Sequence, residues 1–564
     1  MGTSFTGLQK LVALSLITLV ALIAVSQFTK GDASGTATGT ASDAATFSGN
    51  GGTGFTDPNC ALNGTTPPTD VGGAVQQCSQ QDPGQLATQV GHDKIALNFT
   101  WLLIMGSFVL FMQAGFALLT TGLTRAKNAG HMMMLNFAAF VIAWIAYFAV
   151  GFAFQFGGAA INAAPGNLGG AMVLGHLLQV SGSHWGLLGL HGFFLQSGHT
   201  YDVGALALFF FEVVFMETAG YIIVGAIAER INFKTFILAE LAIGGIIYPI
   251  YGNWLWGGGW LSQIGSSMSL GHGAVDFAGS GVVHSIGGWT ALSLAILLGP
   301  RLGKFNKDGK PNAIPGHSIP FVVVGTFILL FGWMGFNPGS TLGSSDLRIS
   351  VIIENTATAS VFGAAAAMAY TAFRYGKPDI SMSCNGMLAG LVAITAPCAF
   401  VAPYAAAIIG GVAGLLVCIS VWFWDNVAHV DDPCGAVSVH GVCGAWGVIA
   451  VGLFADGTYG ASWNGISGNV SGLFYGDAGQ LGAQAISVVV CFAWAFGVTT
   501  VLFGLYKMVS SIRVSPEVEI QGLDIPEFGV AGYSGFVMER ELHGYIPEEL
   551  MAKAARPAIE PGPA

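Results

Sequence analysis

Charged side chains are scarce in this sequence. Lys and Arg number 19 and Asp and Glu number 30 among 564 residues, so 9% of the chain is charged while 53% is hydrophobic. A soluble domain carries about 25% charged residues, so this chain cannot cover a water-facing surface of its size. A soluble enzyme and a largely disordered protein are therefore excluded. We expect an all-α polytopic membrane protein embedded in a lipid bilayer.

Densely basic stretches and metal-binding patterns are missing as well. The net charge is −11, and no segment is dense in Lys and Arg, which excludes nucleic-acid binding. No spacing of Cys and His matches a zinc site, and no nucleophile or metal constellation of an enzyme stands out. We expect no nucleic-acid partner, no cofactor and no enzymatic activity.

The eight cysteines are unevenly placed. Cys60 and Cys78 are the only ones before position 384, and both lie in a polar stretch that we expect to be exported. Exported cysteines pair readily, so we predict a disulfide between them. The other six lie in or beside apolar runs, where small buried side chains are the simplest interpretation.

The first thirty residues carry a targeting pattern. Lys10 precedes an apolar run over 11–25, and Ala24-Val25-Ser26 is a tolerable cleavage site. Fifteen apolar residues are short for a span of about 20 but suit a signal peptide. We predict a signal peptide over 1–26, with a short first transmembrane helix as the alternative. Residues 27–92 then form an exported segment rich in Gly, Ser and Thr.

Eleven apolar stretches are long enough to span a membrane, and Gly/Pro/Asn/Asp-rich turns separate them. We predict a membrane domain over 93–511, followed by a cytoplasmic tail over 512–564. The spans are expected near 95–119, 131–156, 204–228, 235–256, 277–300, 318–338, 349–373, 384–402, 404–424, 437–456 and 483–510.

The basic residues fix the expected direction of these spans. If the chain before residue 95 is outside, only Lys30, Lys94 and Arg348 fall outside, apart from Lys10 in the signal sequence. The long loops 157–203 and 457–482 contain no Lys or Arg, and both are expected to be external. This asymmetry follows the positive-inside rule. We predict a multi-pass protein of the cell (inner) membrane with its N-terminus outside and its C-terminus in the cytoplasm.

A short pattern occurs twice, five spans apart. Asp-x7-His-x3-Gly is found as Asp276, His284 and Gly288, and again as Asp432, His440 and Gly444. An odd number of spans per copy makes the second copy enter from the opposite side, so we predict inverted five-plus-five repeats with a functional site near the midplane.

Of the twelve histidines, the two of this repeat lie within the predicted spans, and the other ten fall in loops or at span ends. An ionisable side chain inside a membrane indicates function by default, although two independent packing histidines are the alternative. Facing imidazoles can share one hydrogen bond, and burial favours their neutral form. Such a pair suits a small neutral polar molecule or a relayed proton.

Several longer motifs resemble the ammonium transporter (Amt/Mep/Rh) family over about residues 93–530. They are GLTRAKN, GAIAERINF, DFAGSGVVHSIGG, GFNPGS and DDPCGAVSVHGVCG. The resemblance implies eleven spans, an outside N-terminus, inverted repeats and a pore through each subunit of a homotrimer. It also implies that ammonium and ammonia are the substrates.

The resemblance assigns roles to individual residues. An external aromatic site with a hydroxyl would bind ammonium through Phe215, Trp256 and Ser340. Phe336 would stack on Phe215 to gate the pore. His284 and His440 would line the pore and relay protons, and Asp276 would support the site electrostatically. Trp256 and Ser340 favour the Amt branch over the Rh branch. Lipid-facing or core phenylalanines and an interfacial tryptophan are the alternatives.

Two aspartates are expected to act through the backbone. Asp276 begins the fifth span, where its carboxylate can cap following N–H groups while stabilising a nearby cation. Asp432 is its repeat mate and is expected to be a structural cap on the cytoplasmic side.

The expected mechanism starts from the cost of burying an ion. An unpaired cation in an apolar pore costs several kcal/mol or more. We therefore expect capture of ammonium at the external site, deprotonation, and passage of ammonia past the histidines, with or without proton co-transfer. An ammonium sensor with little transport is one alternative, although no kinase or cyclase pattern follows the last span. A channel for another small neutral solute is the other, and the aromatic site disfavours it.

Some segments depart from the family pattern or extend it. Loop 157–203 is long, and 261–272 is an insertion beside the expected vestibule. Glu212 and Glu217 lie within the third span, with helix packing as the simplest explanation. GLDIPEFG in the tail resembles a cytoplasmic segment that packs under the trimer and often works with a P-II signal protein.

Overall fold

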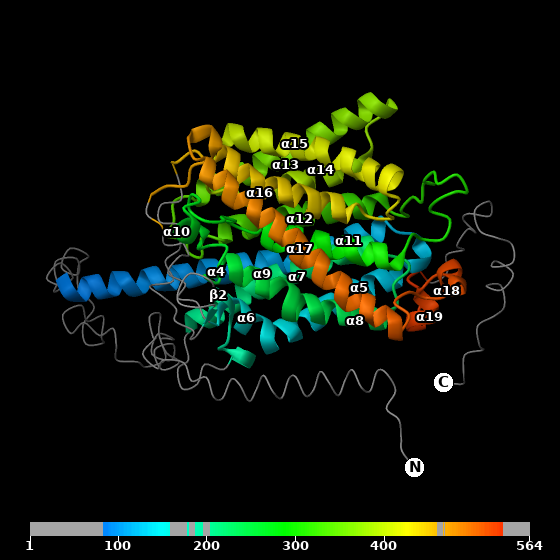
Figure 1. Cartoon of the computed structure of the whole chain (residues 1–564), viewed down its shortest axis with the longest axis horizontal. Coiled ribbons are helices and arrows are strands. Elements are labelled where there is room, and N and C mark those ends of the chain that lie inside the picture. The colour runs from blue at the N-terminus through cyan, green and yellow to red at the C-terminus, as the bar shows by residue number, and fades with distance from the viewer. Residues whose placement is uncertain are drawn as a thin grey trace, which may run out of the picture.

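The computed structural model describes residues 83–157, 177–179, 186–195, 203–458, 466 and 468–533. The predicted signal peptide and the predicted disulfide between Cys60 and Cys78 lie outside these residues. Helices dominate the described chain, and the long ones run side by side along the longest axis of the molecule (Figure 1). The predicted class of helical membrane protein is confirmed.

Ten of the described helical segments are long and apolar enough to cross a membrane. They are α4 (Pro83–Gly122), α5–η3–α6 (Ala129–Ala146, Tyr147–Gly151, Phe152–Phe156), α7 (Val203–Ile227), α8–η5–α9 (Phe233–Ala242, Ile243–Ile247, Tyr248–Leu255), η6–α11 (Ser280–Ser285, Ile286–Leu298), α12 (Ile319–Gly339), α13 (Ile349–Tyr375), α15–η7 (Pro403–Phe423, Trp424–Ala428), η8–α16 (Val437–Val442, Cys443–Phe454) and α17 (Ala478–Val509).

Shorter elements complete the described chain. They are η2 (Ala126–Asn128), β1 (Leu177–Gln179), β2 (Gly186–Gly189), η4 (Phe193–Leu195), α10 (Ile264–Met268), α14 (Ile380–Ile394), η10 (Leu473–Tyr475), α18 (Pro516–Gln521) and α19 (Asp524–Phe528). The strands β1 and β2 pair antiparallel within the expected long loop 157–203. The predicted domain boundary at residue 93 falls inside α4.

The eighth expected span, 384–402, is shorter in the structure. Helix α14 ends at Ile394, and the chain then turns until Ala402. The turn begins here because the carbonyls of Thr395 and Ala396 accept bonds from the backbone N–H groups of Ala278 and Phe277. The fifteen-residue helix falls below the length of about 20 that a full span needs. The count of eleven spans therefore stays a prediction.

The fifth expected span, 277–300, begins later, at Ser280. Residues 272–279 before it are buried but not helical, so their backbone needs partners other than an intrahelical ladder. Two amides on α17 supply them. Gln480 bonds the N–H of His272 and the carbonyl of Gly273, and Gln484 bonds both backbone groups of Val275. These bonds hold the irregular segment against the bundle.

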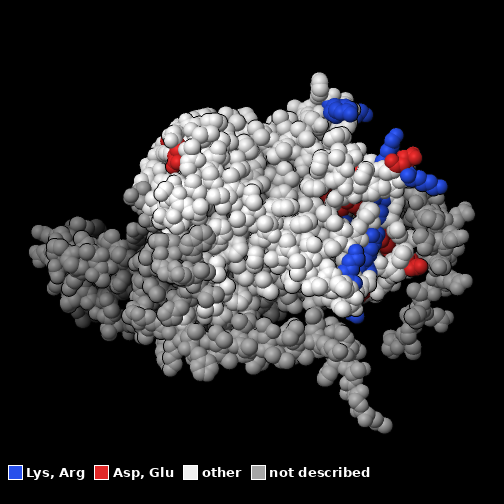
Figure 2. Space-filling model, viewed as in Figure 1, with Lys and Arg blue, Asp and Glu red and all other residues white. Residues whose placement is uncertain are grey.

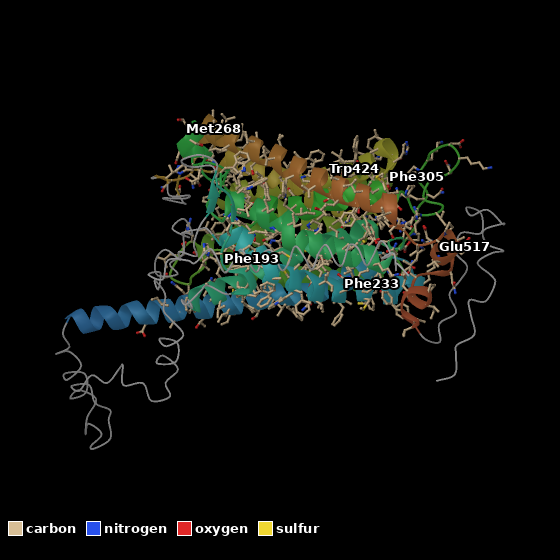
Figure 3. All side chains as sticks on the ribbon, turned by 60° about the horizontal axis from the view of Figure 1, so that its bottom comes forward. Phe193, Phe233, Met268, Phe305, Trp424 and Glu517 are labelled. Atoms are coloured by element: carbon tan, nitrogen blue, oxygen red, sulfur yellow. The ribbon has the colours of Figure 1, made fainter. Side chains whose placement is uncertain are left out.

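The bundle has two distinct ends. The α10 end carries Met268, and the α18 end carries Phe305 and Glu517 (Figure 3). On the face drawn in Figure 2, blue Lys and Arg side chains gather at the α18 end, while among the described residues drawn at the α10 end the charged side chains are red and acidic.

The two predicted repeats contact each other reciprocally. Helix α11 packs against η8, and α16 packs against η6, so the π-helical turn of each repeat lies on the α-helix of the other. Both predicted histidines lie on these π-helical turns. Such turns are rare and concentrate at functional sites.

Candidate functional site

His284 and His440 meet in the core, although 156 positions separate them in the chain. Their Nδ1 atoms lie 3.3 Å apart, and both side chains are buried. Two neutral imidazoles at this distance share one hydrogen bond, in which one Nδ1 donates and the other accepts. The Nε2 of His284 is buried without a partner among the described residues.

Aromatic rings surround the histidine pair. The His284 ring stacks on Trp333 with centroids 5.0 Å apart and on Phe336 at 5.6 Å. Phe116 lies 6.3 Å from the His440 ring. The Trp333 indole donates to the hydroxyl of Thr395, which fixes its plane against His284. The imidazoles therefore stand in an apolar environment that disfavours their charged form.

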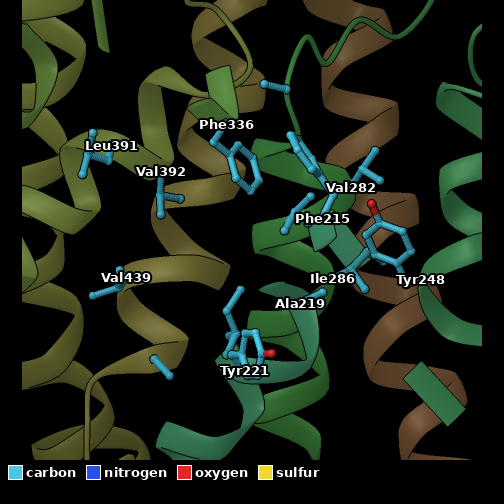
Figure 4. Close-up of a cluster of buried hydrophobic side chains, with 14 of the residues drawn as sticks. Phe215, Ala219, Tyr221, Tyr248, Val282, Ile286, Phe336, Leu391, Val392 and Val439 are labelled. Carbon is cyan, nitrogen blue, oxygen red and sulfur yellow. The ribbon is translucent and has the colours of Figure 1, made fainter. Parts of the chain in front are cut away.

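Phe215 and Phe336 stack directly against each other. Their ring centroids are 3.8 Å apart and their planes differ by 24°. The two rings come from α7 and α12 and point toward one another in Figure 4. Because Phe336 also stacks on His284, this ring pair lies immediately beside the histidines.

Trp256 and Ser340 lie next to this ring pair. The Trp256 ring is 6.3 Å from Phe215 in an edge-on arrangement. The Ser340 hydroxyl donates to the carbonyl of Phe336 over 2.9 Å, one helical turn earlier. Its single proton is therefore used, and the hydroxyl oxygen keeps lone pairs for an N–H donor. The structure thus brings the rings of Phe215, Trp256 and Phe336 together and places Ser340 one helical turn from Phe336.

Asp276 connects Trp256 to the histidine-bearing turn. Its carboxylate accepts bonds from the N–H groups of Gly279, Gly281 and Val282, so it caps η6. Its own carbonyl accepts from the Trp256 indole N–H over 2.7 Å. Burial raises the pKa of this carboxyl to about 6, and the backbone bonds oppose that rise. Both carboxylate oxygens are therefore occupied by backbone donors.

Asp432 occupies the matching place in the second repeat. Its carboxylate accepts from the N–H groups of Ala436 and Val437 and so caps η8, the turn that carries His440. Burial raises the pKa of this carboxyl to about 6 as well. The two aspartates anchor the two π-helical turns in the same way.

A buried ion-pair network holds the chain around Asp432. Glu229 pairs with Arg125 at 2.6 Å and with Arg301 at 3.2 Å, and Arg301 also pairs with Asp431 at 2.8 Å. Burial alone would raise the pKa of Glu229 and Asp431, but the nearby guanidinium charges outweigh it and hold both pKa values well below their usual range. The Arg230 guanidinium donates to the Asp431 carbonyl.

Comparison with known proteins identifies the family. Residues 100–533 match the model of the Ammonium Transporter Family. The ammonium transporter Amt2 of Archaeoglobus fulgidus is 48% identical over 459 residues, which is 81% of this chain and 92% of that protein. The chain belongs to the ammonium transporter family.

Solved structures of relatives show the same fold. A structure described as a sensor Amt protein is 36% identical, with a TM-score of 0.65 over 77% of this chain and 99% of that one. Mep2 of Candida albicans is 28% identical, with a TM-score of 0.60 over 74% of this chain and 86% of that one. Members of this family transport or sense ammonium in membranes and are not enzymes.

Some residues of this family member's site were not singled out from its sequence. Trp333 stacks on His284, and Phe211 lies 4.5 Å from the Phe215 ring. Neither is distinguishable by type among many aromatics in apolar helices. Gln480 and Gln484 carried a usable signal, because two amides at i and i+4 on an apolar helix need buried polar partners.

Proposed function

We propose that this protein transports ammonium by capturing the cation at an aromatic site and passing ammonia through a buried pore. Phe215, Trp256 and Ser340 form the capture site, and Phe215 with Phe336 closes the mouth below it. Ammonium loses its proton there, and ammonia moves past His284 and His440. The observation that carries this proposal is the contact of 3.3 Å between the two histidine Nδ1 atoms beside the stacked phenylalanines.

Capture as a cation follows from the chemistry of the lining groups. An aromatic face attracts a cation by roughly 0.5–2 kcal/mol, more when water is excluded. Ser340 has already donated its proton to Phe336, so its oxygen accepts an N–H from the substrate. A neutral solute such as urea or water gains little from the aromatic faces, which disfavours the alternative of a neutral-solute channel.

Deprotonation follows from the environment beyond the rings. An unpaired cation there would lose its hydration shell among Trp333, Phe336 and neutral imidazoles, which costs several kcal/mol. Ammonia avoids that cost. The proton follows through the imidazoles, because a hydrogen bond between His284 and His440 passes a proton when each ring accepts on one side and donates on the other.

The membrane arrangement is also part of the proposal. Arg125, Arg301 and Arg513 lie at the α18 end, each bound to residues there, which supports a cytoplasmic location for that end. We place the protein in the cell membrane as a homotrimer with an external N-terminus. A P-II signal protein would meet it at the α18 end.

Uptake of labelled methylammonium by cells that lack their own ammonium transporters tests the proposed function. Wild-type protein should restore uptake, and His284→Leu and His440→Leu should each lower it at least tenfold at equal membrane abundance. His429→Asn is the matched control, since His429 is exposed and its φ of 53° suits Asn. Unchanged uptake in both leucine variants would refute the histidine pore.

An ammonium sensor with little transport is the second candidate, and one observation favours it. This chain matches the structure described as a sensor Amt protein over 99% of that protein's length. In this chain the segment after α17 docks onto the membrane helices, since Asp524 caps α5 and Glu527 caps α8. Saturable methylammonium binding without uptake by the wild-type protein would favour sensing over transport.

A further inference from the structure

Two buried carboxyl groups lie near Gly220, Glu217 on α7 and Glu240 on α8. Glu217 is 1% exposed and Glu240 is 0% exposed. Both oxygens of Glu240 and Oε1 of Glu217 have no hydrogen-bond partner among the described residues. Neither residue forms an ion pair with any of the described residues. Within the part of the chain that the structure describes, no cation, and for three of the four oxygens no hydrogen bond, therefore offsets the cost of burying these two carboxyl groups.

The contact between the two helices is built around Gly220. A Cβ added to Gly220 would lie 2.5 Å from Oε2 of Glu240, so the missing side chain makes the space that this carboxyl occupies. Glu217 precedes Gly220 by three positions on the same helix, and residues at i and i+3 are neighbours on one helix face. The two carboxyl groups therefore lie within about one helical turn of each other.

This carboxyl pair lies off the pore. Two helical positions rotate a side chain by about 200°, so Glu217 points away from the face of α7 that carries Phe215. A Cβ added to Gly287 would contact the side chain of Ile222, so the face near Phe215 and Ile222 is the one packed on α11. The proposed ammonium pathway therefore does not account for the pair.

The neighbouring titratable groups offer no cationic partner. Those whose side chains the structure describes on α7, α8 and the elements packed against them are Glu212, Tyr221, Lys234, His131, His284, Tyr147, Tyr248, Tyr251 and Asp93. Lys234 is exposed in the first turn of α8, and six positions place it on a different face from Glu240.

We propose that Glu217 and Glu240 form a buried proton-binding site, separate from the histidine pair. A carboxylate buried without a cation costs several kcal/mol, and two adjacent carboxylates repel each other as well. Protons remove both costs. A protonated carboxyl is neutral and carries one O–H donor, so it no longer repels its neighbour. This site therefore binds a proton at a pH at which exposed carboxyl groups are already ionised.

Infrared spectroscopy of the full-length protein in lipid vesicles tests this site. At about pH 7 an exposed Glu with a pKa of about 4.3 is ionised, so protonated carboxyl absorption reports buried groups. We expect a C=O absorption band from protonated carboxyl groups, and this band should shift in heavy water. Glu240→Gln and Glu217→Gln should each lower its intensity by the contribution of one carboxyl group. Gln keeps the shape of the side chain, so both variants should fold.

Control variants make the outcome specific. Asp308→Asn alters an exposed carboxyl in the loop 299–318, outside the candidate membrane spans, and should leave the protonated C=O band unchanged. Glu212→Gln removes a buried carboxyl that accepts from Gln155, and should leave the intensity of the Glu217–Glu240 pair in place. If Glu217→Gln and Glu240→Gln remove carboxylate absorption instead, both groups are ionised and the proposal is wrong. This readout does not depend on transport.

Discussion

Gly288 of the first repeat lies directly against Gly441 of the second. A Cβ added to Gly288 would be 2.1 Å from the Gly441 nitrogen, and one added to Gly444 would be 2.5 Å from the Ser280 carbonyl oxygen. The glycine of each Asp-x7-His-x3-Gly copy therefore lets its helix touch the histidine-bearing turn of the other copy. This close approach brings His284 and His440 within 3.3 Å.

Enlarging either glycine should separate the histidines. We expect Gly288→Ala and Gly444→Ala to lower methylammonium uptake at least tenfold, because backbone atoms in the way must move. Overpacking of this kind costs about 1–3 kcal/mol. Gly411→Ala is the control, since a Cβ there meets nothing within 4 Å, and its uptake should be normal. Normal uptake by Gly288→Ala would show that the close approach is not needed.

The cap at Asp276 should act on substrate affinity through Trp256. In Asp276→Asn one acceptor oxygen becomes an NH₂ group, which cannot accept the backbone N–H bonds. The backbone carbonyl of residue 276, which accepts from the Trp256 indole, should therefore shift. Loss of a cap costs about 0.5–2 kcal/mol. We expect the half-saturating ammonium concentration to rise several-fold with a smaller change in maximal rate. A change confined to maximal rate would contradict this positioning role.

Trp256 itself should set affinity more strongly. Trp256→Leu removes a cation–π contact of roughly 0.5–2 kcal/mol, so we expect apparent affinity to fall by about 2- to 30-fold. Concentration dependence of methylammonium uptake measures the change. Trp422→Leu, at a half-exposed position on α15, is the control and should leave affinity unaltered. Equal affinities for wild type and Trp256→Leu would remove this residue from the capture site.

The ion-pair network should give stability with a defined pH dependence. The pKa of Asp431 is lowered, so its stabilisation is present above the unfolded pKa of about 3.9 and is lost as the pH falls through the lower folded value. Asp431→Asn should cost about 3 kcal/mol between pH 8 and 5, because the buried Arg301 loses the closer of its two carboxylate partners and keeps only Glu229. Thermal unfolding of detergent-solubilised protein measures this loss of stability. The difference in unfolding temperature between wild type and Asp431→Asn should become smaller below about pH 4.

A more exposed ion pair gives the matched control for the network. Asp425 pairs with Lys304 at 2.9 Å near the surface, where such pairs contribute about 0–1 kcal/mol. Asp425→Asn should therefore barely change the unfolding temperature. If Asp425→Asn and Asp431→Asn had equal effects, the buried network would have no special part in holding η8.

The sequence predicted much of this site because its repeat and apolar runs are strong signals. Asp276, His284, Asp432 and His440 recur at one spacing, and the structure places all four on or beside two matching turns. The membrane class followed from composition alone. These features depend on local pattern, which a single sequence displays directly.

Other features depend on tertiary contacts that a single sequence does not display. The early end of α14 arises from bonds between Thr395 and the distant Ala278. The irregular entry before Ser280 is possible only because Gln484 satisfies Val275. The proximity of Glu240 to the helix face of Glu217 is another such feature, because Glu240 lies on a different helix and the space at Gly220 brings it close.

Current across a solid-supported membrane tests the histidine relay most directly. Vesicles that contain wild-type protein receive a pulse of ammonium, and the charge that moves is recorded against a matched potassium pulse. The account predicts an ammonium current in wild type, a smaller methylammonium current, no potassium current, and loss of the ammonium current in His284→Leu and His440→Leu. An ammonium current of wild-type size in either variant would contradict the relay.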